Sequence, residues 1–160
     1  MFGLDAIMTT KVITVTLSTT LAEARSTMKE HRIRHLPVVN ESGEMVGLLT
    51  QSDVLAAADS ILRDAENRIP AREISIRDVM VTKIATVDEN ASLRQAALFL
   101  EKHRIGCLPV VADEKLVGII TDTDFVGVAI NLLEQLEELE PIEEEHEELE
   151  PVEEELEATQ

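Results

Sequence analysis

A Thr and an Asp three residues apart occur twice in the chain, each time in the same setting. Residues 47–53 read GLLTQSD and residues 118–124 read GIITDTD. An ionised Asp only accepts hydrogen bonds, so it suits a ligand that offers two neighbouring hydroxyl groups, as ribose does. If the Asp lies in the first turn of a helix, the free N–H groups beside it also attract anions. Thr50 with Asp53, and Thr121 with Asp124, are therefore candidate ligand-binding residues.

The same residues also fit a purely structural role. A Thr followed three residues later by an acidic residue is typical of a helix N-terminus, and an N-cap Thr stabilises a helix by about 1 kcal/mol. Capping alone would account for both motifs, so the binding hypothesis needs support from the rest of the chain.

The two motifs belong to a longer repeat. Residues 8–39 align with residues 80–111 at a shift of 72, and 14 of the 32 aligned positions are identical. The first copy then has one extra residue in a turn, and the two motifs follow at a spacing of 71. Self-similarity of this extent indicates a duplicated unit.

Each copy predicts the order β-α-β-β-α. Residues 12–15 (VITV) and 84–87 (IATV) are short β-branched runs, which favour strands. Thr20 with Glu23, and Ser92 with Gln95, have the spacing of a capping box, so a helix is expected from each and should end near the His-Arg-Ile that both copies contain.

The second half of each copy predicts a hairpin and a further helix. LPVV should begin a strand with Pro at its first position, where a missing N–H is tolerated. Residues 40–44 and 112–115 predict the hairpin turns. The returning strand should lead into a helix that begins near Thr50 or Thr121. The fold class expected is α+β: two tandem β-α-β-β-α repeats packed as a pseudo-twofold pair, followed by an acidic tail.

The expected domain boundaries follow from this repeat. Residues 1–57 form repeat 1, residues 58–72 a linker, residues 73–133 repeat 2, and residues 134–160 a Glu-rich tail expected to be disordered or loosely helical. A unit of fewer than 60 residues buries too little surface to be very stable alone, so the two repeats should pack on each other.

Charge and composition exclude several classes of protein. The formal net charge is −18, but residues 134–160 contribute 14 Glu and no Lys, Arg or Asp, so the rest of the chain is only mildly acidic. The sequence lacks the stripe of basic residues that nucleic-acid binding needs. No apolar run is long enough to cross a membrane, and the N-terminus does not read as a secretory signal. With one cysteine, Cys107, we expect a reducing compartment and a cytoplasmic protein.

The repeated motifs MxTKxxTV, HRIxxLPVV and GxxTxxD resemble the tandem CBS-domain pair, or Bateman module, over residues 7–133. Within that family the chain is most similar to stand-alone proteins of the acetoin-utilisation type. The resemblance implies a non-enzymatic regulatory module that binds adenine nucleotides (AMP, ADP or ATP) in clefts between the repeats. It implies no required cofactor, with Mg²⁺ as a companion of the nucleotide at most. It also implies a homodimer that acts on a protein partner which the sequence does not identify.

The resemblance further implies which residues line each cleft. One cleft should hold the base with Val12, Ile13, His35 and Leu36 and the ribose with Thr121 and Asp124. The other should use Ile84, Ala85, Cys107 and Leu108 with Thr50 and Asp53. Pro37 and Pro109, from the same LPVV segments, complete the expected sets.

The copies differ where a phosphate would lie. Arg34 precedes His35 in the first copy, whereas Gly106 precedes Cys107 in the second. Arg can form two parallel hydrogen bonds to phosphate oxygens, and Gly and Cys cannot. One cleft could therefore be empty or prefer a less charged ligand, unless Arg32 and Arg104 compensate.

Several alternatives stay open at this point. The clefts could bind NAD or S-adenosylmethionine, or the module could be a ligand-free structural or oligomerisation unit. The matched histidines, His31 and His103, either end helices or meet as metal ligands. Cys107 is either a nucleophile or a small buried thiol. The dimer is expected through apolar residues of the second helices: Val54, Leu55, Phe125, Val126 and Val128.

Overall fold

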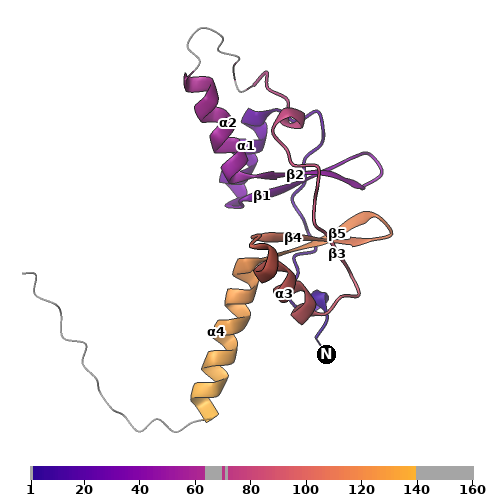
Figure 1. Cartoon of the computed structure of the whole chain (residues 1–160), viewed down its shortest axis with the longest axis vertical. Helices are drawn as coiled ribbons and strands as arrows, with labels where there is room; N and C mark the ends of the chain where they lie inside the picture. Colours follow the sequence, from indigo (N-terminus) through magenta and orange to yellow (C-terminus); the bar gives the residue numbers. More distant parts are fainter. Residues whose placement is uncertain (1, 64–69, 71, 140–160) are drawn as a thin grey trace, which may run out of the picture. The chain divides into compact units, whose positions relative to one another are not determined.

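The computed structural model describes residues 2–63, 70 and 72–139. The chain divides into two compact units, residues 1–127 and residues 128–160. The first unit contains repeat 1 and repeat 2 up to the first turns of its last helix (Figure 1). Among the described residues, no helix combines the length and the apolar character needed to cross a membrane.

Both repeats contain a helix, a two-stranded hairpin and a second helix in the same order, and repeat 2 has a short first strand in addition. In repeat 1 these are α1 (Leu21–His31), β1 (His35–Val39), β2 (Met45–Thr50) and α2 (Gln51–Arg63). In repeat 2 they are β3 (Val87–Asp88), α3 (Leu93–His103), β4 (Cys107–Ala112), β5 (Lys115–Thr121) and α4 (Asp122–Leu139). Short 3₁₀ helices η1 (Leu4–Ala6) and η2 (Ile76–Asp78) precede the repeats. The predicted α+β class with two tandem repeats is confirmed.

The predicted capping boxes begin α1 and α3. The Glu23 N–H donates to the Thr20 hydroxyl at 3.2 Å, and the Thr20 N–H donates to the Glu23 carboxylate at 2.8 Å. Ser92 and Gln95 make the same reciprocal pair. Both helices end at the predicted His, followed by an Arg in the left-handed conformation, with φ of 54° and 50°.

The two predicted first strands are largely absent, and a proline in each repeat explains why. Pro37 is the third residue of β1, not the first as expected. The Val15 N–H donates to the Pro37 carbonyl at 3.0 Å, and the Val39 N–H donates to the Val15 carbonyl at 2.9 Å. The next bond of this parallel ladder would run from the N–H of residue 37 to the carbonyl of Ile13, but proline has no N–H. Pairing therefore stops at Val15, and residues 12–14 are not part of a strand.

The second repeat has the same irregularity. Its parallel pairing is limited to β3, where Val87 lies opposite Val110 and Asp88 opposite Val111. Pro109 takes the place of Pro37, so residues 84–86 are left outside the strand. The hairpin strands pair in full, β1 with β2 and β4 with β5, each with a register shift, between Val38 and Val39 in one hairpin and between Val110 and Val111 in the other.

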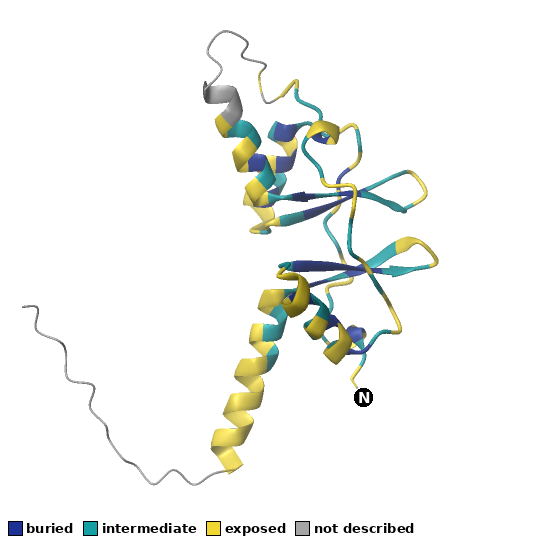
Figure 2. Cartoon of the chain, viewed as in Figure 1, coloured by how far each residue is buried: buried dark blue, intermediate teal, exposed yellow. Residues whose placement is uncertain are grey.

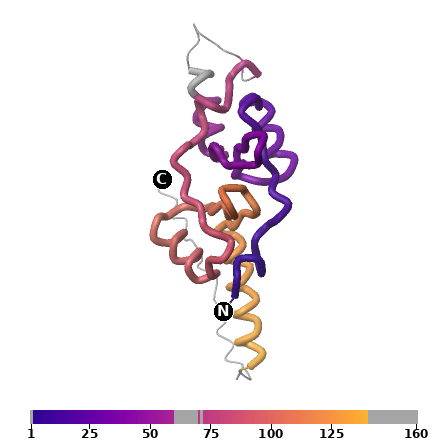
Figure 3. The backbone as a smooth tube through the Cα atoms, turned by 90° about the vertical axis from the view of Figure 1, so that its right-hand side faces the viewer, coloured from indigo at the N-terminus to yellow at the C-terminus, as the bar shows by residue number. Residues whose placement is uncertain are grey.

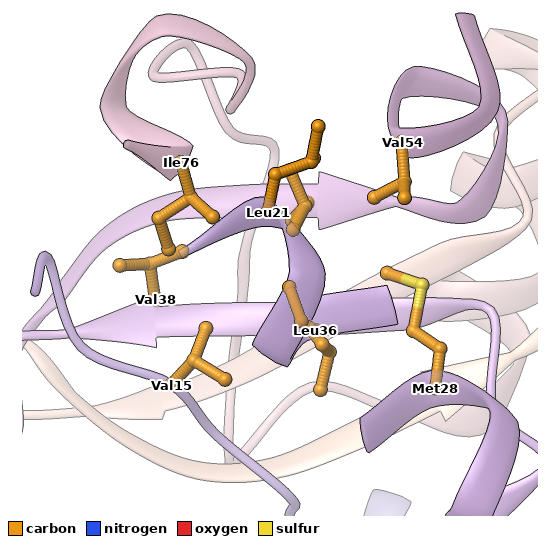
Figure 4. Packing of buried hydrophobic residues seen from close by; sticks show 9 residues of the cluster. Val15, Leu21, Met28, Leu36, Val38, Val54 and Ile76 are labelled. Atoms are coloured by element: carbon orange, nitrogen blue, oxygen red, sulfur yellow. The ribbon is translucent and has the colours of Figure 1, made fainter. Parts of the chain in front are cut away.

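Each hydrophobic core is completed by the segment that precedes the other repeat. Ile76 is fully buried in the core of repeat 1, and Leu4 is fully buried in the core of repeat 2. Figure 4 shows Ile76 packed beside Val38 and Leu21. In Figure 3 the N-terminal segment runs down to the second repeat, where Thr9 bridges to Ile119. Core packing therefore extends across the domain boundary expected at residue 73. The sequence repeat does not indicate this exchange of core residues.

This crossing explains the glycine of the repeated motif. A Cβ atom on Gly118 would lie 2.7 Å from Met8 Sδ, and one on Gly47 would collide with the sulfur of Met80. Met8 and Met80 are the first residues of the aligned repeats, so the Met of one motif and the Gly of the other meet in space. A residue with a Cβ would force these methionine side chains to shift, so glycine lets the crossing segment lie close to the strand.

The expected dimer residues differ in exposure. Val54 is 1% exposed and belongs to the core of repeat 1, so its assignment to a surface was wrong. Leu55 and Val126 are 50% and 56% exposed, and Phe125 and Val128 are half-buried. In Figure 2, buried residues follow the sheets, whereas α4 is mostly exposed along its length.

Candidate functional site

A cleft of about 220 Å³ lies between the two repeats. One side comes from the segment before α1 and from the turn between α1 and β1. The other comes from the end of β5 and the first turn of α4. Its lining residues are Thr9, Lys11, Val12, Ile13, Arg32, Ile33, Arg34, His35, Ile119, Thr121, Thr123 and Asp124. We refer to it as the first cleft.

A second cleft, of about 270 Å³, is formed by the equivalent segments with the repeats exchanged. Its lining residues are His35, Leu48, Thr50, Val81, Lys83, Ile84, Ala85, Ile105, Gly106 and Cys107. Most of these stand at positions that align with first-cleft residues, and His35 lines both clefts.

Ten of the fifteen predicted site residues line these two clefts in the expected combinations. The first cleft brings together Val12, Ile13, Arg34, His35, Thr121 and Asp124. The second brings together Thr50, Ile84, Ala85 and Cys107.

The other five predicted residues do not line either cleft. Leu36 and Leu108 are fully buried, because alternate residues of a strand face opposite sides and these two face the cores. Pro37 and Pro109 are also fully buried in the sheets. Asp53 lies on α2 outside the lining of the second cleft and is half-buried.

Both Thr-x-x-Asp motifs cap their helices, so the structural role is present. The Thr50 hydroxyl accepts from the Asp53 N–H at 3.2 Å and donates to Asp53 Oδ2 at 2.7 Å. In the second copy the Thr121 N–H donates to Asp124 Oδ2 at 2.8 Å. Within the described residues, these bonds occupy one oxygen of each carboxylate. The other oxygen of Asp124 can accept from a ligand in the first cleft, so capping and binding are compatible.

Residues 12–14 and 84–86, which are not part of the sheets, supply unpaired backbone groups to the clefts. Among the described residues, no hydrogen bond is made by the backbone of Ile13 or Ala85, whose carbonyl groups lack a ladder donor because Pro37 and Pro109 have no N–H. Each thus offers an N–H donor and a C=O acceptor at the wall of a cleft. The edge of a purine base presents the complementary groups, so the irregular first strand is suited to hold a flat heterocycle.

Sequence reasoning missed several lining residues, most of which occur as matched pairs. Lys11 and Lys83 both come from the repeated MxTK, and Ile119 and Leu48 both lie between the Gly and the Thr of the repeated motif. The signal was therefore present in the alignment. A lysine can bind phosphate as a point charge, so the recurrence of Lys11 and Lys83 in the two copies could have marked both as candidate contacts.

The clefts differ in charge. Lys11, Arg32 and Arg34 line the first cleft, whereas Lys83 is the one lysine or arginine among the lining residues of the second. Arg34 Nη2 lies 3.9 Å from Asp122 Oδ1, and both side chains are more than half exposed. An exposed pair at this distance is weak, so the guanidinium can turn toward an anion in the first cleft.

His35 and Cys107 are neutral groups at physiological pH. Burial lowers the pKa of His35, the nearby Arg34 lowers it further, and Asp122 acts in the opposite direction. Burial raises the pKa of the Cys107 thiol to about 12, with Asp122 and Asp124 adding to the effect. Because the thiolate is the nucleophile, this pKa favours the buried-thiol interpretation of Cys107.

The matched histidines lie at the ends of helices. His31 and His103 are the last residues of α1 and α3, both are exposed, and the His103 ring packs 4.2 Å from that of Phe99. In the part of the chain that the structure describes, no group of three or more His, Cys, Asp or Glu is arranged to hold a metal ion.

Solved structures with the same fold include three informative ones. The putative acetoin utilization protein AcuB from Vibrio cholerae is 42% identical, with a TM-score of 0.73 over 88% of this chain and 99% of that one. The CBS domain pair of protein MJ0100, in complex with 5-methylthioadenosine and S-adenosyl-L-methionine, is 26% identical, with a TM-score of 0.70 over 81% of this chain and 97% of that one. CBSX2 in complex with AMP is 26% identical, with a TM-score of 0.70 over 83% of this chain and 99% of that one.

The family model for the CBS domain matches residues 4–60 and 76–131. Among curated relatives, the chain spans 75% of one and 50% or less of some longer ones. Two matches in tandem, each over one of the repeats described above, identify the family. The chain belongs to the CBS-domain family, as a tandem CBS pair similar to AcuB.

Proposed function

We propose that this CBS pair is a non-enzymatic sensor that binds an adenine nucleotide of the AMP, ADP or ATP class in its first cleft. Occupancy would be transmitted by a population shift between two arrangements of the module. The size of that shift is limited by the difference in affinity of the ligand for the two arrangements.

One observation carries the proposal. The first cleft combines backbone groups of Ile13 for a base, Asp124 for ribose hydroxyls, and the cationic side chains of Lys11, Arg32 and Arg34 for phosphate. Its volume of about 220 Å³ is below the usual range for small-molecule sites, so the phosphate end of the ligand would extend toward solvent, beside Arg34. The AMP and adenosyl complexes of the related CBS pairs support the same ligand class.

The alternatives make different demands on the cleft. NAD and S-adenosylmethionine share the adenosine portion, but the first is larger and the second carries a sulfonium cation, which the Lys and Arg side chains of the first cleft disfavour. Mg²⁺ would enter as a companion of ADP or ATP, held by their phosphates. A ligand-free structural module would leave the cationic wall without a role.

A thermal-shift panel with AMP, ADP, ATP, NAD and S-adenosylmethionine tests the proposal. A ligand at about 100 times its dissociation constant adds roughly 2.7 kcal/mol to the free energy of unfolding if it ignores the unfolded chain. We expect the adenine nucleotides to raise the melting temperature and Asp124→Ala to weaken that effect. If no member of the panel shifts the melting temperature, the ligand-free structural module becomes the better account.

We further propose that the protein acts in the cytoplasm as a homodimer, assembled through exposed apolar residues of α2 and α4. The ligand-dependent arrangement would then be read by a protein partner. Neither nucleic acid nor a membrane is proposed as a partner, because the sequence carries no stripe of basic residues.

A further inference from the structure

The two clefts occupy equivalent places but are not equivalent in charge. At the position where the first cleft has Arg34, the second has Gly106, and where the first has His35, the second has Cys107. Arg32 lines the first cleft, whereas its counterpart Arg104 is not among the lining residues of the second. The second cleft is thus left with Lys83 as its cation.

A carboxylate also lies close to the second cleft. The Asp122 N–H donates to the Gly106 carbonyl at 3.1 Å, and a Cβ atom on Gly106 would lie 3.4 Å from Asp122 Oδ2. The carboxylate of Asp122 therefore stands beside the wall where a phosphate would have to lie. The Asp122 side chain is 56% exposed, so water and salt screen its charge, but a phosphate placed beside it would still be repelled.

The remaining wall of the second cleft is largely apolar. Val81, Ile84, Ala85 and Ile105 line it, and the thiol of Cys107 is protonated at neutral pH because its pKa is raised to about 12. Such a surface favours a base and a sugar that carry no charge.

We propose that the two clefts take different ligands: a phosphorylated adenine nucleotide in the first, and a phosphate-free, uncharged adenosine compound in the second. This inference rests on the proposed function, because it assumes that the clefts bind adenosine. It makes Arg34 and Gly106 the residues that determine specificity for phosphate. The chain would then report on two related metabolite classes at once.

The test is calorimetry on the full chain with AMP and adenosine as the probes. We expect AMP to fill one site per chain and adenosine to bind one further site in the AMP-saturated protein. Equal binding of AMP to both clefts would overturn the inference, and so would failure of adenosine to add a second event. Both of those results leave nucleotide binding itself intact, whereas absence of binding by either probe would refute the proposed function.

A pair of substitutions assigns the effect to Gly106. Gly106→Arg supplies the missing guanidinium, and Gly106→Gln supplies similar bulk without charge. A charged hydrogen bond corresponds to about 10- to 100-fold in affinity, so the Arg variant should bind AMP at two sites and the Gln variant at one. If the two variants bind AMP alike, charge does not separate the clefts and the inference fails.

The reactivity of the single cysteine reports on ligand binding in the second cleft alone. Cys107 lines that cleft and not the first. Adenosine should slow its reaction with a small neutral thiol reagent at raised pH, and AMP should not. Protection by AMP and not by adenosine would reverse the assignment and overturn the proposal.

Discussion

Arg34 of the first repeat and Asp122 of the second are paired across the repeats, with Nη2 and Oδ1 3.9 Å apart. Within each repeat the backbone makes an equivalent bond at this place, since the Gln51 N–H donates to the Arg34 carbonyl at 2.8 Å and the Asp122 N–H donates to the Gly106 carbonyl at 3.1 Å. In the side chains the symmetry is broken, because Gly106 has nothing to offer Gln51. The duplicated fold has kept its backbone geometry, and its charges have become unequal.

Replacing Arg34 separates phosphate binding from base binding. If Arg34 contacts phosphate, Arg34→Ala should weaken AMP or ATP by about 1.5–3 kcal/mol and leave adenosine nearly unchanged. The salt dependence of nucleotide affinity should also fall, because a screened attraction has been removed. Calorimetry at two ionic strengths measures both effects.

Stability should respond little to the same change, because an exposed ion pair contributes about 0–1 kcal/mol. Equal losses for AMP and adenosine would mean that Arg34 acts by packing. If neither affinity changes, Arg34 faces solvent and the inferred difference between the clefts has to be withdrawn.

Local patterns and duplication were sufficient to predict the helices and the hairpins, whereas the pairing of Thr121 with residues of the first repeat came from the family resemblance. Capping boxes and hairpin turns depend on neighbours in sequence, so Thr20 and Ser92 could be assigned from the chain alone. The role of Pro37 could not, because its effect depends on which edge of β1 faces residues 12–15. The exchange of Leu4 and Ile76 between the cores could not be predicted either, because the type of an apolar residue does not indicate which core it joins.

The contact between Gly118 and Met8 predicts a cost for a single added methyl group. A Cβ atom at residue 118 would lie 2.7 Å from Met8 Sδ and 3.3 Å from the Thr9 carbonyl oxygen. Because overpacking forces side chains or backbone to shift, Gly118→Ala should lower the free energy of unfolding by about 1–3 kcal/mol. Gly127→Ala is the matched control, since a Cβ atom there meets nothing within 4 Å and helical Ala is favoured over Gly by up to about 1 kcal/mol.

Denaturant unfolding of both variants measures these opposite effects. If Gly118→Ala is as stable as the parent protein, the crossing segment has room to move, and the glycine of the motif needs another explanation.

His35 should make stability depend on pH in a defined direction. Its pKa is lowered in the folded protein, by burial first and by Arg34 second, so the unfolded chain binds its proton more readily. Stability should therefore be highest above the ordinary value of about 6.5 and should fall as the pH drops from there toward the folded pKa. His35→Gln should flatten this part of the profile.

The comparison removes contributions that both proteins share, including the exposed His31 and His103. Free energies of unfolding measured from about pH 7.5 down to pH 5 give the two curves. Parallel curves would show that His35 is not the group whose protonation destabilises the fold.

The second helices should hold two copies of the chain together. Val126 on α4 and Leu55 on α2 are 56% and 50% exposed, and both have apolar neighbours on the same helices. Burial of such side chains is favourable, and a charge placed in the middle of a small interface disrupts it. Val126→Glu should therefore raise the dimer dissociation constant by about 10-fold or more. Because Val126 is exposed, the folded monomer should tolerate the change.

Ser42→Glu, which adds the same charge at the exposed tip of the β1–β2 hairpin, should leave the dimer intact. Sedimentation at tens of micromolar distinguishes these results, and a parent protein that is already monomeric there would contradict assembly through α2 and α4.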